Sequence, residues 1–199
     1  WEDVSKPHSL LPGLFETCQI MQLIQVEKGN SVLLMGPRGN WWTELLMYIG
    51  AKEIVVLETD ALRREVLTER WNNLRLDVVA KAFDCNINII GIGELDDYTP
   101  EHGFDRVLST GMFPSLPLSI MMRLQDDGYA VLPIENENRS MLQLIQHHGE
   151  GELMAQWVSC WDVDPWSEEV LVALETGAEL ESCETIDNSR EKIEAAWCN

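Results

Sequence analysis

The amino-acid sequence predicts an α/β protein whose sheet is mainly parallel and ends in an antiparallel hairpin. Through the first two thirds of the 199 residues, short apolar runs alternate with amphipathic helical patterns, which is typical of βαβ units. After Ile134, two alternating runs flank the turn at residues 148–151, which indicates a hairpin. Beyond Pro165 the chain is acidic and helical in character. We therefore expect an α/β domain at residues 1–166 and an acidic helical extension at residues 167–199.

The first elements are predicted from apolar periodicity and from the turns between them. A helix fits Leu14 to Val26, because apolar residues recur on one side and Lys28-Gly29-Asn30 then stops it. Ser31 to Met35 is a buried strand that leads into a glycine-bearing turn. Trp41 to Tyr48 is the next helix, which Gly50 ends.

The middle of the chain continues this alternation. Glu53 to Leu57 is a second buried strand. Asp60 is expected to cap a long charged helix that runs to about Ala82, because its carboxylate can accept hydrogen bonds from the amides of the first turn. Asn86 to Gly91 is a third strand, and Asp105 to Thr110 is a fourth that follows a polar loop.

The last elements complete the sheet. Leu118 to Leu124 is interpreted as a helix, and Asp127-Gly128 as the turn into a fifth strand from Tyr129 to Ile134. Met141 to Gln146 and Leu153 to Trp161 are the two strands of the hairpin. Five strands with helical connections, followed by a hairpin, form a specific arrangement that narrows the choice of fold.

The composition excludes several classes of function. The chain has 34 acidic and 14 basic residues and a formal net charge of -20 at pH 7, which excludes nucleic acid as a partner. Its apolar stretches are shorter than the roughly 18–20 residues that span a bilayer, so a membrane protein is not expected. The five cysteines are scattered with no C-x-x-C pair, which favours neither a disulfide framework nor a metal site. We expect a cytoplasmic protein without a bound metal.

Three features are expected to meet at the carboxyl ends of the first three strands, where open α/β sheets bind ligands. The turn after the first strand carries Gly36 and Gly39, whose bare backbone lets a ligand approach the next helix. Glu58 ends the second strand, where its carboxylate is placed to accept hydrogen bonds from the two hydroxyls of a ribose. Residues 91–94 follow the third strand, where an adenine ring can lie. Together these features predict a site for an adenosine-bearing ligand.

The order of these segments and their residue patterns resemble those of the class I S-adenosylmethionine-dependent methyltransferases, most closely those of the protein-L-isoaspartate O-methyltransferase family. The strongest likeness lies in Phe104 to Ile134, which resembles the family's fourth strand, helix and fifth strand. Residues 5–8 (Ser-Lys-Pro-His) are similar to the family's Ser-x-Pro-His element, and the likeness covers roughly Val4 to Trp166. The resemblance implies a Rossmann-like methyltransferase fold, S-adenosyl-L-methionine as the cofactor with no metal, and methyl transfer to a carboxylate of a protein or a small molecule.

The glycine-rich turn departs from the pattern of the family that it resembles, which is E-x-G-x-G-x-G. Gly36 falls on its first glycine, whereas Arg38 and Asn40 stand at the second and third, so the motif is degenerate. Asn40 is expected to keep the turn, because asparagine is the non-glycine residue best able to adopt a left-handed conformation. Arg38 either swings out or pairs with the cofactor's carboxylate. Leu34 stands where the family has an acid on the first strand.

The resemblance implies a set of site residues. Glu58 falls on the family's ribose-binding acid, and Ile92 stands where the family's Gly-Asp-Gly has its acid, unless a shifted alignment brings in Glu94 instead. Ser5 inherits the catalytic role of orienting the acceptor carboxylate, and no general base is needed because a carboxylate is already ionised at neutral pH. The cofactor-binding residues that the resemblance implies are Gly36, Arg38, Gly39, Asn40, Glu58 and Ile92.

Two functions stay open at this point. The first is an S-adenosylmethionine-dependent methyltransferase related to the isoaspartate repair enzymes. The second is a catalytically inactive protein of the same fold that serves as an interaction or regulatory subunit. A nicotinamide dehydrogenase is a third and weaker reading, because the chain lacks G-x-G-x-x-G after its first strand. The acidic extension carries apolar residues that can dock on the domain or on a protein partner.

Overall fold

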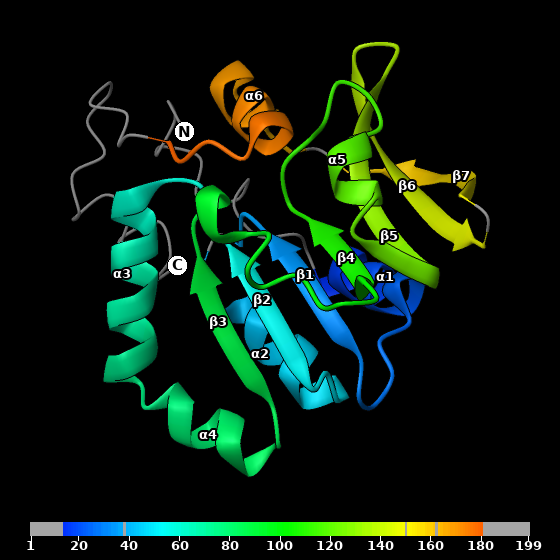
Figure 1. Cartoon of the computed structure of the whole chain (residues 1–199). Coiled ribbons are helices and arrows are strands. Elements are labelled where there is room, and N and C mark those ends of the chain that lie inside the picture. The colour runs from blue at the N-terminus through cyan, green and yellow to red at the C-terminus, as the bar shows by residue number, and fades with distance from the viewer. Residues whose placement is uncertain (1–13, 38, 150, 162, 181–199) are drawn as a thin grey trace.

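The protein is built around one seven-stranded sheet with the strand order β3-β2-β1-β4-β5-β6-β7 (Figure 1). The computed structural model describes residues 14–37, 39–149, 151–161 and 163–180. Neighbouring strands from β3 to β5 run parallel, while β6 and β7 pair antiparallel. The expected α/β architecture, with a parallel core and a terminal hairpin, is confirmed.

The elements follow in the expected order. The strands are β1 (Ser31–Met35), β2 (Glu53–Leu57), β3 (Asn86–Ile90), β4 (Phe104–Ser109), β5 (Leu124–Asn136), β6 (Arg139–His148) and β7 (Glu152–Cys160). The helices are α1 (Leu14–Ile24), α2 (Trp41–Ile49), α3 (Ala61–Asn73), α4 (Leu76–Ala82), the 3-10 turn η2 (Ile92–Glu94), α5 (Leu118–Met121) and α6 (Glu168–Thr176). None of the helices described is long and apolar enough to cross a membrane.

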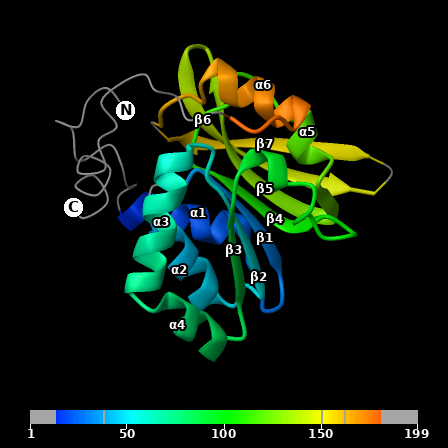
Figure 2. The ribbon, with the colours of Figure 1, turned by 60° about the vertical axis from the view of Figure 1, so that its left-hand side comes forward.

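The sheet separates two apolar layers. Along β1, Val32 and Leu34 face a core shared with α1, α2, α3 and α4, whereas Leu33 and Met35 face a second core shared with η2, α5 and α6. This alternation follows from the two-residue period of a strand, and a strand buried on both faces reads as a continuous apolar run. Figure 2 shows α1, α2 and α3 gathered on one side of the sheet.

The prediction of one long helix from Asp60 to about Ala82 is wrong in one respect, because the structure has two helices in this stretch, α3 and α4. Asp60 caps α3 as expected, since its Oδ1 accepts a hydrogen bond from the backbone N–H of Arg63 at 2.9 Å. The helix breaks before Arg75, which has a left-handed conformation with φ of 55°. The break turns α4 so that Leu76 and Ala80 are buried in the first core, and this packing overrides the local helical tendency.

The fifth strand begins earlier than expected. Leu124 pairs with Phe104 and Tyr129 with Arg106, so a bulge takes up the extra residues of β5. Asp127, at φ of 64°, lies in this irregular stretch rather than in a turn before the strand. Because Leu124 already belongs to the sheet, the helix expected over residues 118–124 shortens to α5. The other elements end within two residues of their expected bounds.

Candidate functional site

The strand order creates a crevice at the carboxyl edge of the sheet. The chain lays β2 and β3 on one side of β1 and then crosses back to place β4 on the other side. Ligands of open α/β sheets bind outside the carboxyl ends of the strands, at the point where the strand order reverses. In this protein that point lies between the turn after β1 and the loop after β4.

The turn after β1 is held open by two glycines. Gly36 has φ of 63° and donates its N–H to the carbonyl of Leu57 at 2.9 Å, and its own carbonyl accepts a hydrogen bond from the hydroxyl of Thr110. Gly39 has φ of 111°. The expectation that Asn40 adopts a left-handed conformation is wrong: its φ is -82°, because Gly39 makes the left-handed step instead and leaves the next residue to begin α2.

The side chain of Asn40 is buried in this turn. Its Nδ2 finds no hydrogen-bond acceptor among the described residues. A buried donor without an acceptor costs about 1–3 kcal/mol, so an oxygen atom of a ligand at this place would be stabilising.

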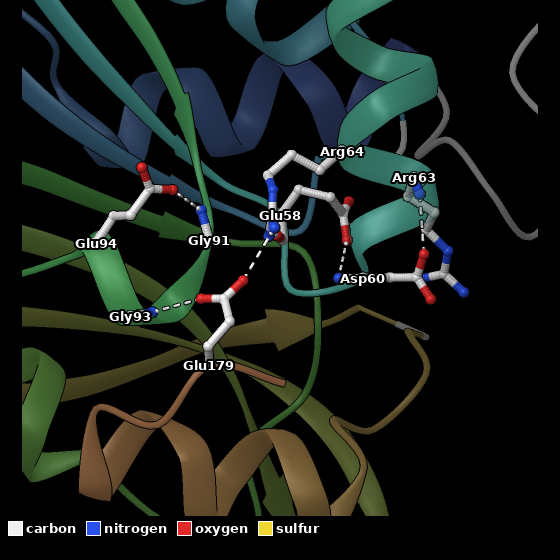
Figure 3. A network of polar contacts seen from close by, with 8 residues as sticks. All are labelled: Glu58, Asp60, Arg63, Arg64, Gly91, Gly93, Glu94 and Glu179. Atoms are coloured by element: carbon white, nitrogen blue, oxygen red, sulfur yellow. Dashed lines mark hydrogen bonds and ion pairs between the residues drawn. The ribbon is translucent and has the colours of Figure 1, made fainter. Parts of the chain in front are cut away.

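Glu58 lies directly after β2, as the sequence predicts, and is 3% exposed. One carboxylate oxygen accepts a hydrogen bond from the backbone N–H of Asp60 at 3.2 Å (Figure 3). Burial raises the pKa of Glu58, and the charge of Arg63 opposes that rise. An acid that is buried at the carboxyl edge and accepts a hydrogen bond from only one described group has capacity left for a ligand's hydroxyls.

The loop after β3 offers backbone rather than the side chain that the sequence suggested. Ile92 is 3% exposed and its side chain belongs to the second core. Glu94 folds back, so that its Oε2 accepts from the N–H of Gly91 at 3.0 Å (Figure 3). Gly93 is exposed, which leaves the Gly91-to-Gly93 backbone as the part of this loop that borders the crevice.

Two residues that the sequence did not single out also lie at this edge. Trp166 packs on Gly36 and Gly111, and Glu179 binds the loop after β3 together with Arg64 of α3. Their place depends on the path of the chain after β7. The sequence contains one local feature that points to Trp166, namely a tryptophan directly after a proline at the boundary of the extension.

Two predicted site residues fall outside the described residues, namely Ser5 and Arg38. Of the predicted set, the structure brings Gly36, Gly39, Asn40 and Glu58 to the edge and places the side chain of Ile92 in the core. Within the described ranges, no three His, Cys, Asp or Glu side chains gather to hold a metal ion.

Comparison with protein families identifies one match. Residues 10–161 match the family model "Protein-L-isoaspartate(D-aspartate) O-methyltransferase (PCMT)". A protein-L-isoaspartate O-methyltransferase of Maricaulis maris is 33% identical over 91 residues, which are 44% of this chain and 43% of that protein. One of Flavobacterium psychrophilum is 28% identical over 146 residues, which are 72% of this chain and 60% of that protein. The chain thus spans roughly half of the length of these curated relatives.

Solved structures agree with this match at the level of the fold. The crystal structure of a protein-L-isoaspartate O-methyltransferase from Plasmodium falciparum, in complex with S-adenosyl-L-homocysteine, has a TM-score of 0.62 at 17% identity and covers 77% of this chain and 73% of its own. A second protein-L-isoaspartate O-methyltransferase has a TM-score of 0.63 at 14% identity and covers 76% of this chain and 46% of its own. At these identities the likeness shows the fold.

Proposed function

Because the chain belongs to the protein-L-isoaspartate(D-aspartate) O-methyltransferase family, we propose that it binds S-adenosyl-L-methionine at the carboxyl edge and transfers the methyl group to a carboxylate. The observation that carries this proposal is the buried Glu58, which stands beside the glycine turn at the point where the strand order reverses. The acceptor proposed is the isoaspartyl carboxylate of a protein, and a small-molecule carboxylate is the alternative.

The residues at the edge fit the adenosine and amino-acid parts of this cofactor. Glu58 would accept hydrogen bonds from the ribose hydroxyls, and the backbone from Gly91 to Gly93 would border the adenine. The bare backbone of Gly36 permits close approach, and Nδ2 of Asn40, which has no acceptor among the described residues, is a donor for a cofactor oxygen. Arg38 is proposed to pair with the carboxylate of the methionine part.

The cofactor, when bound, supplies a methyl group on a positively charged sulfur. The protein must then hold the acceptor in line with that methyl and keep water out of the site. A carboxylate acceptor has a pKa near 4, so it is ionised at neutral pH and needs no general base. The place of the described histidines therefore does not count against this activity, although His102 precedes β4 and His147 and His148 end β6, away from the edge. Ser5 is proposed to orient the acceptor carboxylate.

A second candidate is a catalytically inactive member of the fold that acts as an interaction or regulatory subunit. It is favoured by Trp166 and Glu179, which fill space at the same edge. The two candidates make different demands on Glu58. An enzyme needs it to bind the ribose, whereas an inactive relative retains a buried carboxyl group with no ligand to bind.

Calorimetric titration with S-adenosyl-L-homocysteine separates the candidates. We expect binding that Glu58→Ala weakens at least about tenfold, because a lost charged hydrogen bond is worth about 1.5–3 kcal/mol. Glu65→Ala, at an exposed position on α3, is the matched control and should bind as the wild type does. Transfer of labelled methyl to an isoaspartyl peptide, and not to its aspartyl isomer, would then identify the acceptor. If neither the wild type nor Trp166→Ala releases or absorbs heat of binding at millimolar ligand, the proposal that the protein is a methyltransferase is contradicted.

A further inference from the structure

The chain beyond β7 turns back over the carboxyl edge of the sheet. We name residues 166–180 the C-terminal strap. Its middle is α6, which Figure 1 shows above the carboxyl ends of the parallel strands. Ser167 caps this helix by accepting from the N–H of Val170 at 3.3 Å, and Val170, Ala173 and Leu174 are buried in the second core. The strap is therefore packed against the domain, and it touches the edge at both of its ends.

The first end of the strap covers the point where the strand order reverses. A β-carbon placed on Gly36 would lie 2.5 Å from Cη2 of Trp166, and one placed on Gly111 would lie 2.5 Å from its Cε2. The indole thus rests on the turn after β1 and on the loop after β4 at once. The backbone N–H of Trp166 also donates to the carbonyl of Met112 at 2.9 Å. The ring fills the place where the bare glycine backbone would admit a ligand.

The second end covers the loop after β3. Glu179 accepts a hydrogen bond from the N–H of Gly93 at 2.9 Å and pairs with the guanidinium of Arg64 at 2.9 Å (Figure 3). Its carboxylate oxygens would lie 2.6 and 2.8 Å from a β-carbon on Gly91. The same guanidinium donates to the backbone carbonyl of Glu58 at 3.3 Å. Glu179 therefore lies on the backbone proposed to border the adenine and beside the acid proposed to bind the ribose.

We propose that the C-terminal strap is autoinhibitory: Trp166 and Glu179 occupy the site of S-adenosyl-L-methionine, and both must leave before the cofactor binds. The inference rests on the proposed function, because it concerns access to that same site.

The two contacts differ from the rest of the strap in how firmly they are held. The side chain of Glu179 is 47% exposed, and exposed ion pairs contribute little to stability. Trp166 is half-buried and is held by hydrogen bonds to Met112 and Ser109, each of which contributes only modestly to net stability, whereas α6 is held by three buried apolar residues. The ends can therefore release while α6 stays in place.

An engineered disulfide tests the Glu179 contact directly. A β-carbon on Gly93 would lie 3.4 Å from that of Glu179, close to the lower end of the about 3.5–4.5 Å that disulfides span. The φ of Gly93 lies outside the left-handed region, so its backbone accepts a side chain. In full-length Gly93→Cys/Glu179→Cys, oxidation should close the strap, and the pairing is verified by peptide mass mapping. We expect S-adenosyl-L-homocysteine to bind at least about tenfold more weakly to the oxidised form, and reductant to restore the affinity.

Two single variants, Gly93→Cys and Glu179→Cys, are the controls for this experiment. Neither can form the intended bridge, so oxidant should leave the affinity of each unchanged. An oxidised double variant that binds the ligand as tightly as its reduced form overturns autoinhibition, because the closed strap would then be compatible with the ligand.

Trp166→Ala tests the other contact. Removing the indole should raise the population of the open site and tighten binding at least about tenfold. Trp157→Ala, at an exposed tryptophan of β7, is the matched control. If the wild type and Trp166→Ala bind S-adenosyl-L-homocysteine with equal affinity, the proposal of an autoinhibitory strap is overturned and the proposed function stays intact. If neither these proteins nor the reduced double variant bind at millimolar ligand, the proposed function falls and the strap proposal falls with it.

Discussion

Trp166 donates its indole N–H to the hydroxyl oxygen of Ser109 across 3.2 Å. Ser109 is the last residue of β4 and is fully buried, and its hydroxyl also bonds to both the N–H and the carbonyl of Gly111. The indole is therefore attached to the end of the central sheet, and its far edge reaches Gly36. A residue from the end of the domain thus joins the two segments between which a ligand is expected.

Gly36→Ala should destabilise the protein by about 1–3 kcal/mol. The left-handed backbone strains any residue with a side chain, and the new β-carbon would press on the ring of Trp166. Urea unfolding measures the loss. The same substitution in Trp166→Ala should cost less, since only the backbone strain is left, and the double-mutant cycle yields the coupling between the two residues. A cycle with no coupling would place the indole elsewhere in solution.

Glu58→Gln should stabilise the protein at neutral pH by on the order of 1 kcal/mol, while it weakens ligand binding. Burial raises the pKa of Glu58 above its ordinary 4.5. The native state then binds more protons than the unfolded state between 4.5 and the raised pKa, so stability falls as pH rises through that window. Glutamine removes this loss. The stability difference between the variant and the wild type should be near zero below pH 4.5 and grow above it, as urea unfolding across pH would show.

Asp105→Ala should cost about 2 kcal/mol of stability. Its Oδ2 accepts from both the backbone N–H and the hydroxyl of Ser31, at 2.7 and 2.8 Å, and this joins the starts of β1 and β4. Hydrogen bonds to a charged group are worth about 1.5–3 kcal/mol, and the N–H left behind is partly buried. Asp97→Ala, an exposed acid in the loop before β4, is the control and should change the free energy of unfolding by less than about 0.5 kcal/mol.

Arg75→Gly should stabilise the protein slightly, by about 0.5 kcal/mol. The left-handed conformation at φ of 55° costs an arginine roughly 1–2 kcal/mol, and glycine escapes that cost but loses part of the gain to its greater freedom in the unfolded chain. The ion pair lost, to Asp77 at 3.8 Å, is exposed and weak. Arg75→Ala removes the same ion pair without relieving the strain, so thermal melts should rank glycine above wild type and alanine below it.

Local rules predicted most of the strands because apolar runs, turns and caps act over a few residues. The continuous apolar run from Ser31 to Met35 is typical of a strand that is covered on both faces. The cap at Asp60 could be predicted because it depends only on the backbone amides of the next helical turn. The errors fall where packing overrides local preference. Arg75 breaks a helix so that α4 can bury its apolar side, and the bulge opposite β4 draws Asp127 into a strand.

The candidate site divides in the same way. Gly36 and Glu58 could be predicted because each directly follows a strand, and the carboxyl ends of parallel strands meet at one edge. Ile92 could not be placed, since a residue two positions beyond a strand can face either the crevice or the core. It faces the core, because the 3-10 turn η2 packs it against the second apolar layer.

The sequence by itself determined the α/β architecture, the position of the edge and the acid that borders it, because each depends on neighbours along the chain. Only the tertiary structure decided what covers that edge. Trp166 and Glu179 lie about 130 and 86 residues along the chain from Gly36 and Gly93, the glycines that they cover. No local preference encodes such a contact. It arises because β7 ends near the carboxyl edge and the buried face of α6 directs the strap across it.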